Sequence, residues 1–153
     1  MTDPFSTSRI IGHYQGEEPG PLVIAVGGIH GNEPAGVQAL AQLFELLEEE
    51  PQINPGFVFR GEFLALRGNI GALSRGLRFQ DQDLNRIWQD DRIQRLRNER
   101  ETPFAEQTAD AEEQELLKLL DTIEIAIEEY QPREVVLLDL HTTTAKGGIF
   151  TIT

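Results

Sequence analysis

Residues 22–36, LVIAVGGIHGNEPAG, lead from an apolar run through a glycine-rich turn into a helix start. The run at residues 22–26 is short and continuously apolar, which predicts a buried strand. Pro34 fits the first turn of a helix, because the N–H that proline lacks would have no partner there. We therefore predict a strand, a tight turn and a helix that begins near Asn32 or Glu33.

The rest of the chain continues this alternation of strands and helices. Further strands are predicted at residues 8–14, 57–66, 134–140 and 149–153. The run at residues 134–140 is predicted to be a second buried strand. Strands that alternate with helices favour an α/β fold, here a mixed, partly parallel sheet flanked by helices.

Apolar spacing and end signals predict three helices and one long loop. The apolar stripe of the first helix consists of Val37, Leu40, Ala41, Phe44 and Leu47, and Pro51 with residues 54–56 should end it. Residues 92–100 predict a short charged helix. The last helix begins at the capping pair Asp110 and Glu113. The apolar residues that it is predicted to bury are Leu116, Leu119, Leu120, Ile123, Ile127 and Tyr130. Residues 67–90 predict an irregular segment, and loops this long usually have a function.

The composition limits the classes of function. The 153 residues contain no cysteine, so a metal would have to be held by His, Asp or Glu. The formal net charge of −13 argues against a nucleic-acid partner, which needs a basic surface. No apolar run is long enough to span a bilayer, and no secretory signal is visible, so we predict no membrane partner and a cytoplasmic location.

Charged residues gather in separate parts of the chain. The acidic stretches at residues 45–50 and 106–129 are predicted to be solvated helix faces. Arginines concentrate between residues 67 and 100. They could bind a small anion, or they could be ordinary charges on helix surfaces.

Two of the three histidines, His30 and His141, directly follow the buried strands. Ligands bind beyond the carboxyl ends of strands in open α/β sheets, so the two imidazoles would meet at one rim if these strands are neighbours. Glu33 could turn its carboxylate to the same point. Two His and one Glu are a common catalytic zinc set that leaves a fourth position for water. Taken singly, His30 would be an ordinary turn histidine, His141 a strand-end histidine bonded to backbone, and Glu33 a helix-start acid. His13 has no such partner and is predicted to be a surface residue.

The segment from residue 74 to residue 86, SRGLRFQDQDLNR, carries further candidate groups. The adjacent Asn85 and Arg86 offer an amide and a guanidinium, which suit a carboxylate ligand. Arg78 is a second guanidinium, which could polarise a scissile carbonyl. The alternative is a loop with surface salt bridges, which would add little stability.

Three motifs in order, GGIHGNEPAG, RGNIGALSRGLRFQDQDLNRIW and DLHTTT, resemble the succinylglutamate desuccinylase/aspartoacylase family. The resemblance runs from about residue 22 to the end of the chain, and it implies a fold related to the zinc carboxypeptidases. Members hydrolyse the amide bond of N-acylated amino acids, such as N-succinylglutamate or N-acetylaspartate, with one zinc ion. A small anionic N-acyl amino acid is therefore the expected substrate.

The resemblance also implies roles for individual residues. The zinc ligands would be His30, Glu33 and His141. Asn85 and Arg86 would bind the substrate carboxylate, Arg78 would polarise the scissile carbonyl and stabilise the oxyanion, and Asp83 would orient the His30 ring. Asp139, two residues before His141, could support that ring in the same way, or it could be a buried structural residue.

The chain departs from the family at its end. The family's general-base glutamate lies beyond the third zinc ligand, and members also carry a second, mostly β domain. We therefore expect residues 1–153 to be the N-terminal part of a zinc-dependent acylase catalytic domain whose C-terminal remainder is absent. Such a chain would bind metal with little or no turnover, and its sheet would have an unpaired edge prone to association.

Two other functions stay open. One is a zinc carboxypeptidase that acts on peptides. The other is a catalytically inactive module that binds an anion through its arginines without a metal.

Overall fold

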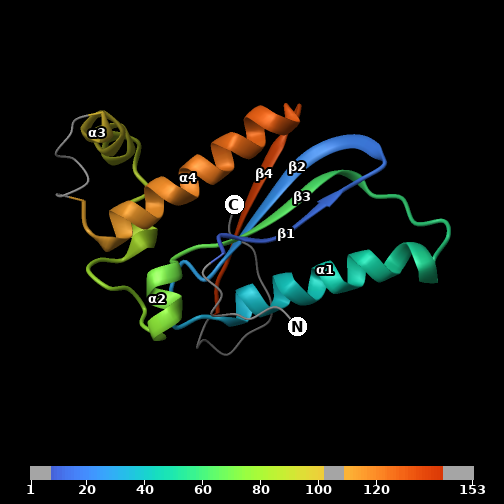
Figure 1. Ribbon diagram of the computed structural model, residues 1–153, viewed down its shortest axis with the longest axis horizontal. Coiled ribbons are helices and arrows are strands. Elements are labelled where there is room, and N and C mark those ends of the chain that lie inside the picture. The colour runs from blue at the N-terminus through green and yellow to red at the C-terminus, as the bar shows by residue number, and fades with distance from the viewer. Residues whose placement is uncertain (1–7, 102–108, 143–153) are drawn as a thin grey trace.

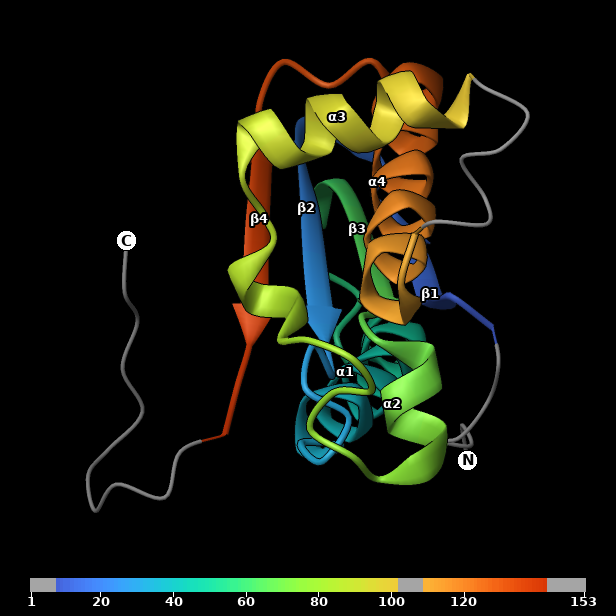
Figure 2. The ribbon, with the colours of Figure 1, turned by 90° about the vertical axis from the view of Figure 1, so that its left-hand side faces the viewer.

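The computed structural model describes residues 8–101 and 109–142, which form a four-stranded mixed sheet with helices on both faces (Figure 1). The strands are β1 (Ile10–Gln15), β2 (Glu18–Gly27), β3 (Arg60–Arg67) and β4 (Val135–Leu140). Their order across the sheet is β1-β3-β2-β4, and Figure 2 shows β4, β2 and β3 side by side. β1 is antiparallel to β3, whereas β2 is parallel to both β3 and β4. The predicted α/β fold with a partly parallel sheet is confirmed.

The sheet is covered by α1 (Ala35–Ile53) on one face and by α4 (Ala111–Tyr130) on the other. Successive side chains of β2 point to opposite faces of the sheet. Leu22 and Ile24 pack with the apolar residues of α4, whereas Ala25 packs with Leu40 and Phe44 of α1. Because both faces are covered, β2 is apolar at every position from residue 22 to 26.

The start of α1 differs from the prediction, whereas its end agrees with it. The helix begins at Ala35, after the expected start, and Pro34 occupies the N-cap position. It continues through Pro51 and ends at Ile53. Pro51 removes only one helical N–H, in the last turn, and the Asn54 N–H donates to the Glu50 carbonyl at 2.7 Å. The helix therefore ends directly before residues 54–56, as predicted, although Pro51 itself lies inside the last turn.

The segment predicted to be irregular, residues 67–90, contains two short helices. They are α2 (Ile70–Arg75) and the 3-10 turn η1 (Leu84–Arg86). The Asn69 side chain caps α2 by accepting from the Ala72 N–H at 3.0 Å. Leu84 of η1 is buried in the core beside α4. The charged helix expected at residues 92–100 is α3 (Asp90–Arg100).

α4 begins with the predicted capping box between Asp110 and Glu113. Ile127 is exposed, so its predicted burial is wrong. The prediction of a solvated acidic face is also wrong for the first turn, because Glu112 and Glu113 are buried. Both carboxylates accept hydrogen bonds that replace those of water.

The prediction that residues 134–140 form a buried strand is wrong for the part of the chain that the structure describes. β4 lies at the edge of the described sheet and pairs with β2 alone. Val135, Leu137 and Leu138 are each at least 40% exposed. Association through this edge stays a prediction. The strand predicted at residues 149–153 lies outside the described residues.

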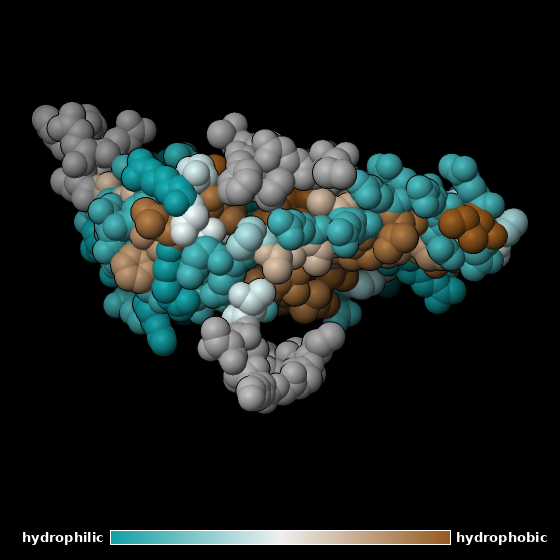
Figure 3. All heavy atoms as spheres, turned by 90° about the horizontal axis from the view of Figure 1, so that it is seen from below, coloured by the Kyte–Doolittle hydropathy of each residue, from teal (hydrophilic) through white to brown (hydrophobic). Residues whose placement is uncertain are grey.

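Apolar areas also reach the surface on the α1 side of the molecule. Figure 3 views this side and shows apolar areas between hydrophilic ones. Leu43, Leu46 and Ile53 of α1 are exposed. Within residues 8–101 and 109–142, no helix combines the length and the apolar character that a membrane crossing requires.

Candidate metal centre

The carboxyl ends of β2 and β4 lie side by side, because Gly27 pairs with Leu140 in the parallel register. The condition on which the predicted metal site depended, that these two strands are neighbours, is therefore met. His30 follows β2 after a short turn, and His141 directly follows β4. The two imidazole ring centroids are 5.0 Å apart.

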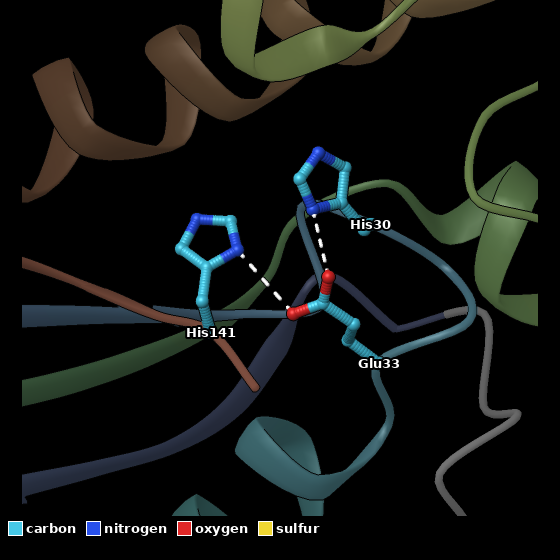
Figure 4. Close-up of side chains that lie close together, drawn as sticks. All are labelled: His30, Glu33 and His141. Atoms are coloured by element: carbon cyan, nitrogen blue, oxygen red, sulfur yellow. Dashed lines mark hydrogen bonds and ion pairs between the residues drawn. The ribbon is translucent and has the colours of Figure 1, made fainter. Parts of the chain in front are cut away.

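Glu33 lies between the two imidazoles, as Figure 4 shows. Its Oε1 is 3.0 Å from His30 Nδ1, and its Oε2 is 3.4 Å from His141 Nδ1. One ligand atom from each of the three residues lies within 4.8 Å of the other two. His30 and Glu33 are buried, whereas His141 is exposed. The site is therefore closed on the β2 side and open on the β4 side.

An aspartate contacts each imidazole at Nε2, the ring nitrogen that faces away from Glu33. His30 Nε2 is 2.9 Å from Asp83 Oδ1, and His141 Nε2 is 2.6 Å from Asp139 Oδ2. Asp139 is exposed, so the alternative of a buried structural role is wrong. In both rings the Nε2 side faces an aspartate, and the Nδ1 side faces Glu33.

Two carboxylates of this site, Glu33 and Asp83, have pKa values below their ordinary ones. Burial opposes ionisation of Glu33, but the Thr142 N–H, which donates to Oε2 at 2.7 Å, and His30 outweigh it and lower the pKa. Burial also opposes ionisation of Asp83. The contacts with His30 and the Asn85 N–H outweigh burial, so the pKa of Asp83 lies below its ordinary value.

The histidines have more acceptors around them than a neutral ring can satisfy. A neutral imidazole has one N–H and one acceptor nitrogen, yet both nitrogens of each ring face a carboxylate oxygen. A proton on Nε2 leaves the lone pair of Nδ1 directed at Glu33. A cation at Nδ1 would give this lone pair a partner. One divalent ion bound by His30, His141 and Glu33 would satisfy both rings, so this donor set fits zinc.

Arg78 reaches the same site from the loop after α2. Its guanidinium lies 3.4 Å from Glu33 Oε1 and 3.5 Å from Asp83 Oδ2, and its side chain is 48% exposed. The Arg78 carbonyl accepts the Gly31 N–H at 3.2 Å, which connects this loop to the turn that carries His30 and Glu33. Arg78 therefore has one side toward the candidate ligands and one toward solvent.

Asn85 and Arg86 follow Asp83 in η1, and both are exposed. Asp83 caps this turn by accepting the Asn85 N–H at 3.0 Å. The structure thus brings five predicted site residues into contact, namely His30, Glu33, Asp83, His141 and Arg78. Asn85 and Arg86 lie close to Asp83 in sequence, and among the described residues their side chains form no hydrogen bond or ion pair with the other five.

Most arginines of the basic stretch are paired with acids. Arg92 and Arg95 of α3 bind Glu113, Arg97 binds Glu124, and Arg100 binds Asp121 at 2.7 Å. For these four arginines, the structure therefore favours ordinary helix-surface charges over a site for a small anion. The third histidine, His13, lies outside the site, where its Nε2 is 2.7 Å from Glu62 Oε2 and its ring stacks on Tyr130.

The sequence patterns did not indicate the buried polar residues that bind the loop at residues 80–82. Glu112 and Asn69 are fully buried and hydrogen-bonded to each other at 2.9 Å. In the sequence, Glu112 is one acid among many on α4. The sequence does not show whether a given glutamate is a buried hydrogen-bond acceptor or a solvated acid, and only the fold distinguishes the two.

Residues 19–153 match the succinylglutamate desuccinylase/aspartoacylase catalytic domain. Among solved structures, the chain resembles the succinylglutamate desuccinylase from Chromobacterium violaceum, with a TM-score of 0.53, 19% identity and coverage of 82% of this chain and 35% of that chain. The corresponding values for succinylglutamate desuccinylase from Vibrio cholerae are 0.51, 20%, 82% and 31%.

The chain thus spans about a third of the length of these two proteins, and at this identity the likeness shows the fold alone. No curated protein matches the chain. The family match extends over most of the sequence and includes all three candidate ligands. The chain belongs to the succinylglutamate desuccinylase/aspartoacylase family.

Proposed function

We propose that this chain supplies the zinc- and carboxylate-binding part of an enzyme that hydrolyses the amide bond of a small anionic N-acyl amino acid. The observation that carries the proposal is the convergence of His30, Glu33 and His141 from two neighbouring strand ends, with an aspartate behind each imidazole. The family, whose members act on acyl amino acids, supports the same reaction class.

His30, Glu33 and His141 would hold the zinc ion. When bound, zinc would lower the pKa of a water to about 7 and polarise the scissile carbonyl. Asp83 and Asp139 would each accept an Nε2–H, which fixes the tautomer and leaves Nδ1 free to bind the metal. Both aspartates would also hold the rings in their present orientation.

The arginine-bearing loop would bind the substrate. Arg78 already contacts the candidate ligand Glu33, so its guanidinium is close enough to donate to the scissile carbonyl oxygen and to the oxyanion that develops from it. Arg86 and Asn85 are exposed beside Asp83 and would hold the substrate carboxylate. Arginine suits this role because its planar fork can donate two parallel hydrogen bonds.

The general base is not assigned to any described residue. The two desuccinylases are much longer than this chain, so we propose that residues 1–153 form the N-terminal part of the catalytic domain. The isolated chain is then expected to bind zinc and ligand with little or no turnover. A cytoplasmic location also stays a prediction.

Calorimetric titration of the zinc-loaded chain tests the proposal. The ligands are N-succinyl-L-glutamate, N-acetyl-L-aspartate and a dipeptide with a free carboxylate. We expect an N-acyl amino acid to bind best and Arg86→Ala to weaken binding at least tenfold, as loss of a charged hydrogen-bond donor does. Arg97→Ala is the matched control, because Arg97 is a partly exposed arginine of α3 that pairs with Glu124 of α4.

Each alternative predicts a different outcome of this titration. Preference for the dipeptide would favour the peptide-cutting carboxypeptidase. Equal anion binding by the metal-free and the zinc-loaded chain would favour the inactive anion-binding module. Either outcome would refute the proposed function.

A further inference from the structure

Glu112 is a fully buried carboxylate that accepts four hydrogen bonds. Its Oε1 accepts from the Gln80 N–H at 2.7 Å and from the Asn69 side chain at 2.9 Å. Its Oε2 accepts from the N–H groups of Asp81 at 2.8 Å and Gln82 at 3.1 Å. One side chain of α4 thus binds three consecutive backbone N–H groups of the loop.

The charge of Glu112 is stabilised by neutral hydrogen-bond donors rather than by a basic side chain. Among the described residues, no arginine or lysine forms an ion pair with it. Burial opposes its ionisation, but the backbone N–H groups and Asn69 outweigh this effect and lower its pKa. The start of α4 adds a favourable helix dipole. Charge-assisted hydrogen bonds of this kind are roughly twice as strong as neutral ones, so they should hold the loop at residues 80–82 strongly to α4.

Other groups at the start of α4 bind two of these three loop residues, Asp81 and Gln82. The Ala111 N–H donates to Asp81 Oδ2 at 3.0 Å, and the Gln82 side chain donates to Asp110. Although Asp81, Asp110 and Glu112 could together surround a cation, each already accepts from a protein donor. Their arrangement is explained by the attachment of the loop, without an ion.

The attached residues lie between the groups that act at the metal centre. Arg78 lies two residues before Gln80, and Asp83, which holds His30, directly follows Gln82. Asn85 and Arg86 come next in η1. A change in the backbone of residues 80–82 would therefore shift Asp83 relative to His30. It would also shift Arg78 and Arg86 relative to the candidate metal ligands.

We propose that Glu112 is the positioning residue of the substrate-binding loop. It fixes residues 80–82 to the start of α4, and it thereby sets Asp83 behind His30 and directs Arg78 and Arg86 toward the ligand. This inference rests on the proposed function, and it names a residue that touches neither metal nor substrate.

Glu112→Gln tests the inference with almost no change in shape. A glutamine offers one oxygen, and its NH2 group cannot accept the N–H groups that now bind the second oxygen. Glu113→Gln is the matched control. Glu113 is also buried in the first turn, but it binds Arg92 and Arg95 rather than the loop backbone. Both variants should melt lower than the parent chain.

Three measurements on the full 153-residue chain separate positioning from stability. They are amide exchange of residues 80–82, zinc affinity by competition with a chelator, and N-succinyl-L-glutamate affinity of the zinc-loaded chain. Glu112→Gln should lose amide protection and weaken zinc binding about tenfold, the scale typical of groups that orient a ligand. Glu113→Gln should keep the parent's amide protection in the loop and both affinities. Glu112→Asp, which keeps the charge, should be intermediate and serves if Glu112→Gln does not fold.

The outcomes distinguish this inference from the proposed function. A folded Glu112→Gln or Glu112→Asp chain with the parent's zinc and ligand affinities would overturn the positioning role and leave the proposed function intact. A parent chain that binds neither zinc nor N-succinyl-L-glutamate would overturn the proposed function, and the positioning role with it.

Discussion

Gly27 is the last residue of β2, and it packs directly against the start of α1. A Cβ at this position would lie 2.7 Å from the Val37 nitrogen and 2.8 Å from the Gly36 carbonyl carbon. Both neighbours are backbone atoms, which cannot rotate away as a side chain can. Gly27→Ala must therefore push the first turn of α1 away from the sheet.

The size of this displacement follows from the contact distances. An ordinary contact begins near 3.4 Å, so α1 would have to move by about 0.7 Å. His30 and Glu33 lie in the turn between Gly27 and α1. Functional groups must stay within about 0.5 Å of their productive geometry, so the two ligands would no longer match one ion. We expect zinc affinity to fall about tenfold.

The stability of the chain should fall as well. Overpacking costs about 1–3 kcal/mol in well-packed sites. For a chain of this length, a loss of 2 kcal/mol corresponds to roughly 4–8 °C in melting temperature. Thermal unfolding and chelator competition on the same samples measure both effects.

Gly56→Ala is the control for this prediction. Gly56 lies in the loop before β3, where the nearest atom to an added Cβ is the Asn54 side-chain oxygen at 3.6 Å. Its melting temperature and zinc affinity should match the parent's. A Gly27→Ala chain with unchanged zinc affinity and melting temperature would refute the claim that the tight packing of this turn sets the site.

Three further predictions concern other parts of the chain. Asp83→Asn removes the carboxylate behind His30, so zinc affinity should fall about 10–100-fold in chelator competition, whereas Asp91→Asn on exposed α3 should leave it unchanged. Because the pKa of Glu112 in the folded chain is below its ordinary value of 4.5, its stabilisation is present above that pH and is lost as pH falls through the folded pKa. Urea unfolding from pH 7 to pH 3 should show this loss, and Glu112→Gln should make the acid slope shallower. Gln131 ends α4 with φ of 44°, a left-handed conformation that favours glycine, so Gln131→Gly should raise the unfolding free energy by about 1 kcal/mol. An unchanged or lower unfolding free energy would contradict that last prediction.

The sequence was most informative where a local pattern has one structural meaning. The apolar run at residues 22–26, the glycine-rich turn and Pro34 predict a strand, a turn and a helix, and the structure has all three. The capping pair of α4 was predicted for the same reason, because two side chains three residues apart satisfy each other's backbone groups.

The sequence was least informative where burial depends on distant segments. Leu137 and Leu138 are apolar, but their exposure depends on whether another element covers β4. Glu112 is charged, yet it is buried because the loop at residues 80–82 supplies its donors. Neither fact is encoded within a few residues of the site. The contact of Asp83 with His30 is also long-range, and only the family resemblance indicated it.

The central claim is that His30, Glu33 and His141 form one zinc site. The most direct test is the zinc content per chain, measured by elemental analysis on the purified parent chain and on His30→Ala and His141→Ala. We expect close to one zinc per parent chain and its loss in both variants. His13→Ala should retain the zinc, because His13 lies outside the site and stacks on Tyr130. A folded parent chain without zinc after incubation with the metal, or variants that retain it, would contradict the account.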